Sequence, residues 1–239
     1  MSSIPKLKLD WCSYAAALFA CKRWHYSKAI PTPPYNLVGV WEDEKFIGCV
    51  IFSRGASNHL GKQYGIEAAE VCELSRIALT EHHHPVSRII RIAIIFLRKQ
   101  SPGLRLIISF ADQNQNHHGG IYQASGWLYT GSTNRSWHYV DKFQRKWHAR
   151  QVSAVGMTPQ YGVMRKAPRI DECTRVEELP KHRYVFPLDK EMTQKLKPLA
   201  RAFPKRCVIS DTGDTFADLA DKGGSSPTIT LQEEQTSWA

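Results

Sequence analysis

In the stretch Glu70-Val-Cys-Glu-Leu-Ser-Arg-Ile-Ala-Leu79, alternate positions form two sets before the stretch becomes apolar: Val71, Glu73 and Ser75 on one side, and Cys72, Leu74 and Arg76 on the other. This alternation predicts a strand that enters the core. Apolar residues at helical spacing then predict a helix that Pro85 opens and that runs to about Lys99. The continuous apolar run Leu104–Phe110 predicts a second strand, and a short helix over 120–124 is closed by Gly126. The order strand, helix, strand, helix predicts an α/β fold with a parallel or mixed sheet.

Segments on both sides extend this core. Helical spacing predicts a first helix from Trp11 to Lys22. The expected strands are a hairpin at 36–41 and 45–52, followed by 127–129, 137–140 and 182–187. The turn-rich stretch 142–169 predicts no element. We expect one domain over residues 1–189 and a C-terminal extension over 190–239 that is largely disordered from about residue 210, because it has little to bury.

The charge balance narrows the classes of partner. The 239 residues include 32 Lys and Arg against 22 Asp and Glu, which gives a formal net charge of +10 at pH 7 and a pI near 9.4. Such an excess favours polyanions, nucleic acid first among them, although a basic pI can also serve solubility alone. The cysteines form no CxxC pair, so the sequence does not predict a zinc knuckle. No apolar stretch has the length and position of a signal peptide or the length of a membrane span. We therefore expect a cytoplasmic protein.

A run of three histidines, His82 to His84, precedes the helix that Pro85 opens. A helix N-terminus can hold a pyrophosphate, and Ser87 and Arg88 would add hydrogen-bond donors there. The turn lacks the glycines of a standard phosphate loop, so an ordinary capped helix is the alternative. Adjacent histidines on one turn point in different directions, which argues against a shared metal ion.

Polar residues come directly after the buried strand that ends near Phe110, where ligands gather in open α/β sheets. They are Asp112, Asn114, Asn116, His117 and His118. Asp112 is the sharpest catalytic candidate among them. The alternative is structural, because Asp and Asn also cap helices and make turns.

Two charged residues, Glu73 and Arg76, fall within the strand that ends at Leu79. By period-two counting they lie on opposite faces, so they would not pair directly unless a bulge intervenes. Charges buried in a strand are costly without a partner, which implies a sheet edge, an ion pair or a functional site.

Basic and aromatic side chains are concentrated in one part of the chain, between residues 135 and 169. They are Arg135, Trp137, His138, Lys142, Arg145, Lys146, Trp147, His148, Arg150, Arg165, Lys166 and Arg169. This mixture suits phosphate contacts combined with stacking or wedging against bases, and we favour contact with DNA over a solvated basic loop.

Five motifs carry a family resemblance. They are Trp24-His25-Tyr26-Ser27, Glu73-Leu74-Ser75-Arg76, Ser109-Phe110-Ala111-Asp112, Gly120-Ile121-Tyr122-Gln123-Ala124-Ser125-Gly126-Trp127 and Lys181-His182-Arg183-Tyr184-Val185-Phe186-Pro187-Leu188. Through them the sequence, from about Trp11 to Leu188, resembles the Mom proteins of Mu-like phages, distant members of the GNAT acetyltransferase superfamily. The resemblance implies a GNAT-like mixed central sheet flanked by helices, with the first 189 residues serving catalysis and DNA binding.

The resemblance also implies an activity. The product would be N6-methylcarbamoyl adenine in double-stranded DNA, made in the host cytoplasm, which protects phage DNA from restriction. It implies an acyl-CoA-type donor, with acetyl-CoA as one candidate, in a cleft between the strand ending at Leu79 and the helix from Pro85. The glycine-rich loop of ordinary acetyltransferases is missing, and a methylcarbamoyl group contains an NH that simple acetyl transfer cannot deliver.

Site residues follow from the resemblance together with the motifs. Catalysis is assigned to Asp112, Arg76, Tyr122 and Glu73, and cofactor binding to Ser87, Arg88 and Arg76. Iron is also implied, with His25, Tyr26 and Asp112 as its ligands. The alternative for His25 and Tyr26 is that they line a pocket for a flipped adenine.

Two other functions stay open at this point. One is a plain GNAT-type N-acetyltransferase of a small amine or a protein, and the other is a DNA-binding protein without catalysis. The sequence does not decide the oligomeric state, for which a homodimer is one candidate.

Overall fold

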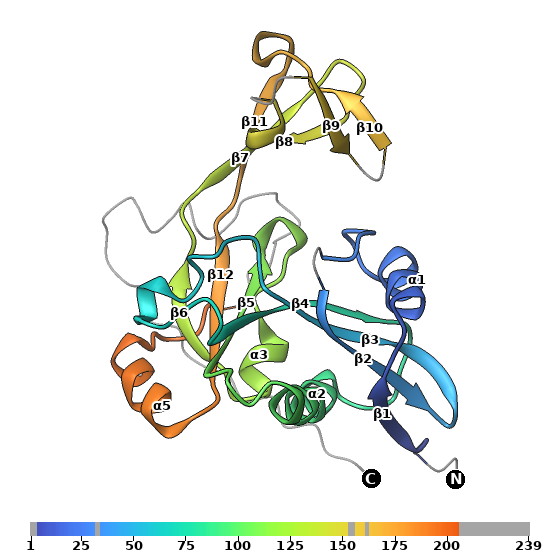
Figure 1. Cartoon of the computed structure of the whole chain (residues 1–239), viewed down its shortest axis with the longest axis vertical. Helices are drawn as coiled ribbons and strands as arrows, with labels where there is room; N and C mark the ends of the chain where they lie inside the picture. The colour runs from blue at the N-terminus through green and yellow to red at the C-terminus, as the bar shows by residue number, and fades with distance from the viewer. Residues whose placement is uncertain (1–3, 32–33, 153–155, 161–162, 206–239) are drawn as a thin grey trace, which may run out of the picture. The chain divides into compact units, whose positions relative to one another are not determined.

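The computed structural model describes residues 4–31, 34–152, 156–160 and 163–205. Its main feature is a seven-stranded sheet with the order β1-β2-β3-β4-β5-β12-β6 (Figure 1). The strands are β1 (Leu7–Trp11), β2 (Pro34–Glu42), β3 (Lys45–Ser53), β4 (Val71–Leu79), β5 (Leu106–Asp112), β6 (Leu128–Ser132) and β12 (Lys181–Pro187). The pair β4 and β5 is parallel, whereas the other described neighbours in this sheet are antiparallel.

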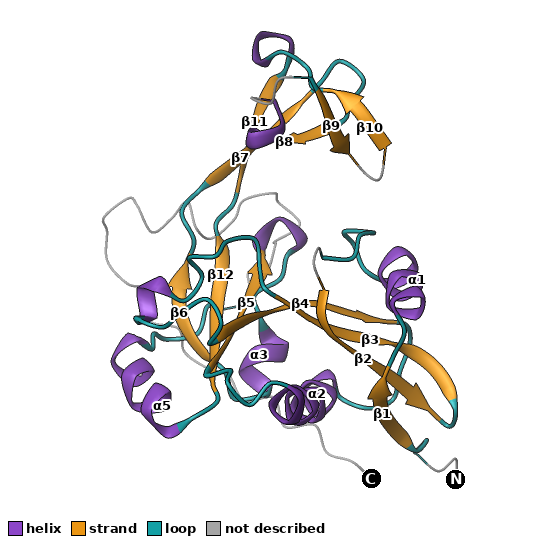
Figure 2. Cartoon of the chain, in the orientation of Figure 1, coloured by secondary structure: helices purple, strands orange, loops and turns teal. Residues whose placement is uncertain are grey.

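Helices cover this sheet, and a second set of strands, with one short helix packed against it, lies between β6 and β12 in the chain (Figure 2). The helices are α1 (Tyr14–Trp24), α2 (Val86–Gln100), α3 (Gly120–Ala124), α4 (Ala149–Val152) and α5 (Lys190–Leu196). The additional strands are β7 (Ser136–Val140), β8 (Lys146–His148), β9 (Met157–Gln160), β10 (Val163–Lys166) and β11 (Thr174–Glu178). They form a three-stranded sheet, β11-β7-β8, and the hairpin of β9 and β10. The predicted class, an α/β fold with a mixed sheet flanked by helices, is confirmed.

Two expectations about elements need correction. The chain begins with β1, which sequence reasoning missed, and the first helix starts at Tyr14 because the Ser13 hydroxyl accepts a hydrogen bond from the Ala16 amide at 3.2 Å. The stretch 142–169, for which no element was predicted, contains β8, α4, β9 and β10. These strands are only three or four residues long, so too few residues alternate to reveal a pattern.

The helix α2 supplies five buried residues to the main core cluster. Its apolar side chains recur at positions three and four apart, and Ile89, Ile90, Ala93, Ile94 and Leu97 are buried against the sheet. The small residues Ala17, Ala20 and Cys21 of α1 pack in a separate cluster against β3 and β4. The two helices therefore hold the central strands β3 and β4 between separate apolar clusters.

The compact unit ends at Pro204, beyond the predicted domain end at residue 189. Met192 and Leu196 of α5 are fully buried against β5 and β12. Arg105 fixes the start of α5, because its guanidinium contacts Asp189 and Glu191, each at 2.8 Å. The tail predicted to be disordered from residue 210 lies outside the described residues. Within the described ranges, no helix is both long enough and apolar enough to cross a membrane.

A matched pair of isoleucines on α2 tests which face of this helix is buried. Ile90 is 0% exposed and Ile95 is 52% exposed. We expect Ile90→Ala to lower the free energy of unfolding by about 2–5 kcal/mol, because it leaves a cavity. Ile95→Ala should change it by less than about 1 kcal/mol. Urea denaturation measures both values, and equal losses would contradict the assigned face.

Candidate functional site

The site begins where two parallel strands separate. The strands β4 and β5 pair only from Val71 to Glu73, opposite Leu106 to Ile108. At the next position the Ser109 hydroxyl donates to the Leu74 carbonyl at 2.7 Å. A side chain thus takes the place of the backbone ladder, and beyond it the polar edges of both strands become available to other groups.

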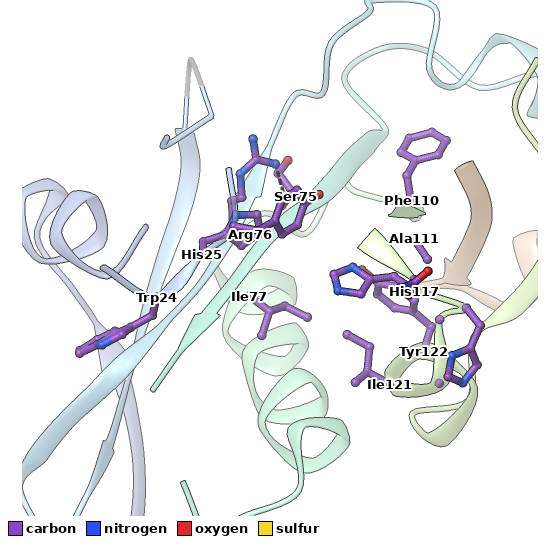
Figure 3. Close-up of a pocket in the computed structure, with 15 residues that line it drawn as sticks. Trp24, His25, Ser75, Arg76, Ile77, Phe110, Ala111, His117, Ile121 and Tyr122 are labelled. Atoms are coloured by element: carbon purple, nitrogen blue, oxygen red, sulfur yellow. Dashed lines mark hydrogen bonds between the residues drawn. The ribbon is translucent and has the colours of Figure 1, made fainter. Parts of the chain in front are cut away.

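A pocket of about 670 Å³ opens beyond this contact (Figure 3). Its wall comes from the end of α1 and the following turn, from β4 and β5, and from the loop that leads into α3. The lining residues are Trp24, His25, Tyr26, Ser75, Arg76, Ile77, Phe110, Ala111, Asn116, His117, His118, Gly119, Gly120, Ile121 and Tyr122. In Figure 3 the β4 side chains and His25 face Phe110, His117 and Tyr122 across the opening.

A bulge in β4 brings the predicted charged pair to one face. Ile51 of β3 lies opposite Arg76, whereas its neighbour Phe52 lies opposite Leu74, so Ser75 is an extra residue in β4. The bulge reverses the alternation, and Glu73 and Arg76 point to the same face. The bulge that was required for Glu73 and Arg76 to share a face is therefore present, and the two charges interact. Burial raises the pKa of Glu73, and Arg76 opposes this rise.

Arg76 is the permanent charge of the pocket wall. Its Nε donates to the Ala29 carbonyl at 3.3 Å and its Nη1 donates to the Ser75 carbonyl at 2.6 Å. None of the other side chains found to line the pocket is a Lys, Arg, Asp or Glu. The guanidinium is therefore held in place by backbone oxygens and offers its remaining donors to an anionic or carbonyl group of a ligand.

His25 and Tyr26 stand in the turn that follows α1. The Nδ1 atom of His25 accepts the Ser27 backbone N–H at 3.1 Å and lies 2.8 Å from the Ser27 hydroxyl. Burial lowers the pKa of His25 to about 4, and Arg76 and His117 add to this effect. The ring is thus neutral near pH 7, and because Nδ1 is an acceptor, its proton resides on Nε2. His25 is a hydrogen-bond donor in the wall.

These contacts do not fit the predicted iron site. A neutral imidazole has one free lone pair, and that of His25 is used by Ser27. The Asp112 carboxylate accepts two bonds from Asn114, each at 3.1 Å, and lies 3.3 Å from Lys181 Nζ. Among the described residues no group of three or more His, Cys, Asp or Glu side chains is arranged to hold a metal. Iron is therefore not supported, and we assign no step to it.

Tyr122 forms the floor of the pocket and stays protonated. Its hydroxyl lies 2.7 Å from that of Ser109. Since the single Ser109 proton is directed to the Leu74 carbonyl, the phenol proton of Tyr122 points to the Ser109 oxygen. Burial raises the pKa of Tyr122 to about 12. Its ring stacks on Tyr184 with centroids 5.0 Å apart, which fixes its position.

Asp112 organises the loop that forms the far wall. Its side chain caps the turn 113–115, and its carbonyl accepts the His117 amide at 3.1 Å. Gly119 has φ +84°, and a Cβ there would collide with the Tyr184 ring, so this position requires glycine. The structure therefore places Asp112 beside the pocket and His117 in its wall.

The predicted cofactor residues Ser87 and Arg88 lie in the first turn of α2 and do not line the pocket. The backbone N–H groups of the turn before α2 are already bound to a carboxylate side chain of this chain, that of Glu42. The Glu42 carboxylate accepts the backbone N–H groups of His83 and His84, each at 2.9 Å, and contacts His83 Nδ1 at 3.0 Å. Although burial opposes it, these bonds lower the pKa of Glu42. Ser87 and Arg88 as donor ligands stay a prediction.

Sequence reasoning assigned roles to four of the wall residues, His25, Tyr26, Arg76 and Tyr122. It also placed three others, Asn116, His117 and His118, in the polar cluster that follows β5. It proposed Glu73 and Asp112 as catalytic, and the structure places both next to the wall, within electrostatic reach of Tyr26. Trp24, Phe110 and Ile121 occur within the family motifs, but sequence reasoning gave none of them a role of its own in the site. Apolar wall residues resemble core residues in a sequence, so no pattern could have marked them.

A sheet that opens between two parallel strands onto a pocket with one permanent cation and several rings defines an α/β protein with an enzyme-like ligand site. The sequence gives the family: the chain belongs to the Mom protein family, whose model matches residues 6–205. The family inferred from the motifs is thereby confirmed. A curated relative, the "Methylcarbamoylase mom" of Escherichia phage Mu, is 25% identical over 196 residues, which cover 80% of this chain and 79% of the relative.

Solved structures with a similar fold include two acetyltransferases. A GNAT family acetyltransferase from Elizabethkingia anophelis with acetyl-CoA bound aligns with a TM-score of 0.39 and 13% identity, covering 76% of this chain and 98% of that one. A Bacillus subtilis acetyltransferase in complex with CoA aligns with a TM-score of 0.41 and 13% identity, covering 77% of this chain and 100% of that one.

The neutral state of His25 can be tested by titration. Its folded pKa of about 4 lies below the ordinary value of 6.5, so unfolding takes up a proton in this range. The contribution of His25 to stability is complete above pH 6.5 and is lost as the pH falls through 4. We expect the His25 ring signals in NMR spectra to titrate near pH 4, with His25→Gln providing the assignment. A midpoint near 6.5 would contradict the buried ring.

Proposed function

We propose that this chain transfers a methylcarbamoyl group to N6 of adenine in double-stranded DNA and so protects phage DNA from restriction in the host cytoplasm. Membership of the Mom protein family over residues 6–205 carries the proposal. The relative named as a methylcarbamoylase supports the group transferred, and the excess of basic residues supports DNA as the acceptor. The pocket between β4 and β5 supports a site for a single base.

The target adenine must leave the base stack to be modified. A pocket of about 670 Å³ has room for a base and the reacting end of a donor. In the proposed complex the adenine stacks on Tyr26, whose ring lies 4.3 Å from that of His25 and 5.6 Å from that of His117. The Nε2–H of His25 donates to a ring nitrogen of the adenine. This corresponds to the base-pocket alternative for His25 and Tyr26 rather than to iron ligation.

The N6 amine is a poor nucleophile, because its lone pair is delocalised into the ring, and it needs a proton acceptor as the new bond forms. We assign that role to His117, the exposed imidazole of the pocket wall. N6 attacks the carbonyl carbon of the donor, and Arg76 stabilises the negative charge that develops on the carbonyl oxygen. The bond between the carbonyl carbon and the departing group then breaks, and His117 returns to that group the proton it took from N6. Tyr122 keeps its own proton in the contact with Ser109 and forms the floor of the pocket.

The donor in this proposal is of the acyl-CoA type, and Arg76 is its first contact. Ser87 and Arg88 are further contacts only if the donor extends from the pocket along the first turn of α2. Acetyl-CoA alone would give N6-acetyl adenine, which lacks one NH relative to the methylcarbamoyl product. The donor must therefore carry the methylcarbamoyl group already, or a nitrogen must be added in a separate step.

Nucleoside mass spectrometry of DNA from cells that express the chain tests the proposal. We expect a modified deoxyadenosine with the mass of the methylcarbamoyl adduct, absent from cells that express Arg76→Ala. An adduct lighter by one NH would indicate acetyl transfer. Unmodified DNA together with an acetylated small amine or protein would replace the proposal with an ordinary N-acetyltransferase.

Three variants separate the roles of Asp112 and His117. We expect His117→Gln to lower the modification rate by about 100-fold or more, the usual size of a lost general base. Asp112→Asn should retain most activity, because asparagine also caps the turn that holds His117. Asp112→Ala should lose activity with the turn. If Asp112→Asn is as inactive as Asp112→Ala, while both proteins are folded, the Asp112 carboxylate itself is the proton acceptor.

A further inference from the structure

The segment between β6 and β12 contains a rigid turn that the proposed chemistry does not use. The turn Asp141–Arg145 joins β7 to β8 and is held from inside by Asp141. One carboxylate oxygen accepts the amides of Phe143 at 2.8 Å and Arg145 at 2.9 Å, and the other accepts the indole N–H of Trp147 at 2.9 Å. Asp141 and Trp147 are both buried, 6% and 1% exposed, so the turn has a fixed shape.

This rigid turn holds an aromatic ring in solvent. Phe143 is 61% exposed. Lys142 Nζ lies 5.4 Å from the centroid of the Phe143 ring, and Arg145 Cζ lies 4.6 Å from it. A single exposed apolar side chain needs no explanation by itself. An exposed ring on a prearranged turn, with two cations close to it, is a surface complementary to a partner that is both anionic and aromatic.

The charge distribution around the turn supports the same partner. Asp141 is the sole acidic residue between 135 and 170, a segment that contains several Lys and Arg residues. The Asp141 carboxylate accepts three N–H groups in and beside the turn, and Glu177 and Glu178 of β11 pair with Arg135 and Lys146. Lys142 and Arg145 are therefore the cations next to Phe143. On the neighbouring strands the Arg175 guanidinium lies 4.3 Å from the centroid of the Trp137 ring, a second exposed pair of cation and aromatic ring.

The geometry points to Phe143 as a wedge that enters the base stack of duplex DNA, with Lys142 and Arg145 on the flanking phosphates. The inference rests on the proposed function, since a base held out of the helix leaves a gap that an apolar side chain can fill. It adds a second part to the site: the pocket receives the base, and the Asp141–Arg145 turn fills the space the base has left. Lys142 and Arg145 supply affinity without sequence preference.

Duplexes that carry 2-aminopurine at successive positions test the wedge without any catalysis. Unstacking raises 2-aminopurine fluorescence, and we expect such a rise with saturating wild-type protein. Phe143→Ala should lose most of it at saturation, while the dependence of log affinity on log salt keeps its slope. The double variant Lys142→Ala/Arg145→Ala should show the reverse: the slope falls by about 2, since each phosphate contact contributes about 0.9, and the fluorescence rise at saturation remains.

Tyr14→Ala is the matched control, because Tyr14 is a 53% exposed aromatic residue of α1 outside this segment. It should match the wild type in both measurements. A fluorescence rise with Phe143→Ala equal to that of the wild type, or no rise at any position with the wild type, overturns the wedge. Failure of the proposed function is a different result: fluorescence responds to Phe143, yet nucleoside mass spectrometry finds no modified deoxyadenosine.

Discussion

The hydrogen bond from the Ser109 hydroxyl to the Leu74 carbonyl is the contact on which the site depends. It lies where β4 and β5 stop pairing, and it satisfies a buried backbone oxygen that the sheet itself no longer reaches. The same hydroxyl accepts a hydrogen bond from Tyr122. Ser109 therefore contacts both the point where the strands separate and the residue that forms the floor of the pocket. A sheet paired to its end here would leave no space for a ligand.

A one-residue bulge has an equally wide effect on the electrostatics. With Ser75 as an extra residue, Leu74 and Ile77 both face the core on the α2 side, while Glu73 and Arg76 share the opposite face. The Arg76 charge then acts on Glu73 and on His25, which are distant from each other in sequence. Burial lowers the pKa of the His25 imidazole and Arg76 adds to that effect, while the same cation limits how far burial raises the pKa of Glu73.

The sequence predicts the central part of the fold well, because α2 and β5 are long enough for periodicity to be read. It fails for β1, a five-residue strand in which Lys8 and Asp10 alternate with apolar residues, and for β8 to β10, where each strand is too short. Motifs identified Arg76 and Tyr122, and the capping role stated as the alternative for Asp112 agrees with the contact of its side chain with its own loop. The Glu42 contact with the turn before α2 joins residues about forty positions apart, so no local pattern reveals it.

The strands β6 and β12 are antiparallel neighbours, and the segment with the Asp141–Arg145 turn is inserted between them. Without this insertion the two strands could be joined as a simple hairpin. The first and last strands of the insertion, β7 and β11, pair with each other, so its ends leave the main sheet together. An insertion of this kind can be lengthened, shortened or exchanged during evolution while the strands around the pocket keep their pairing. The insertion and the pocket can therefore diverge at different rates within one chain.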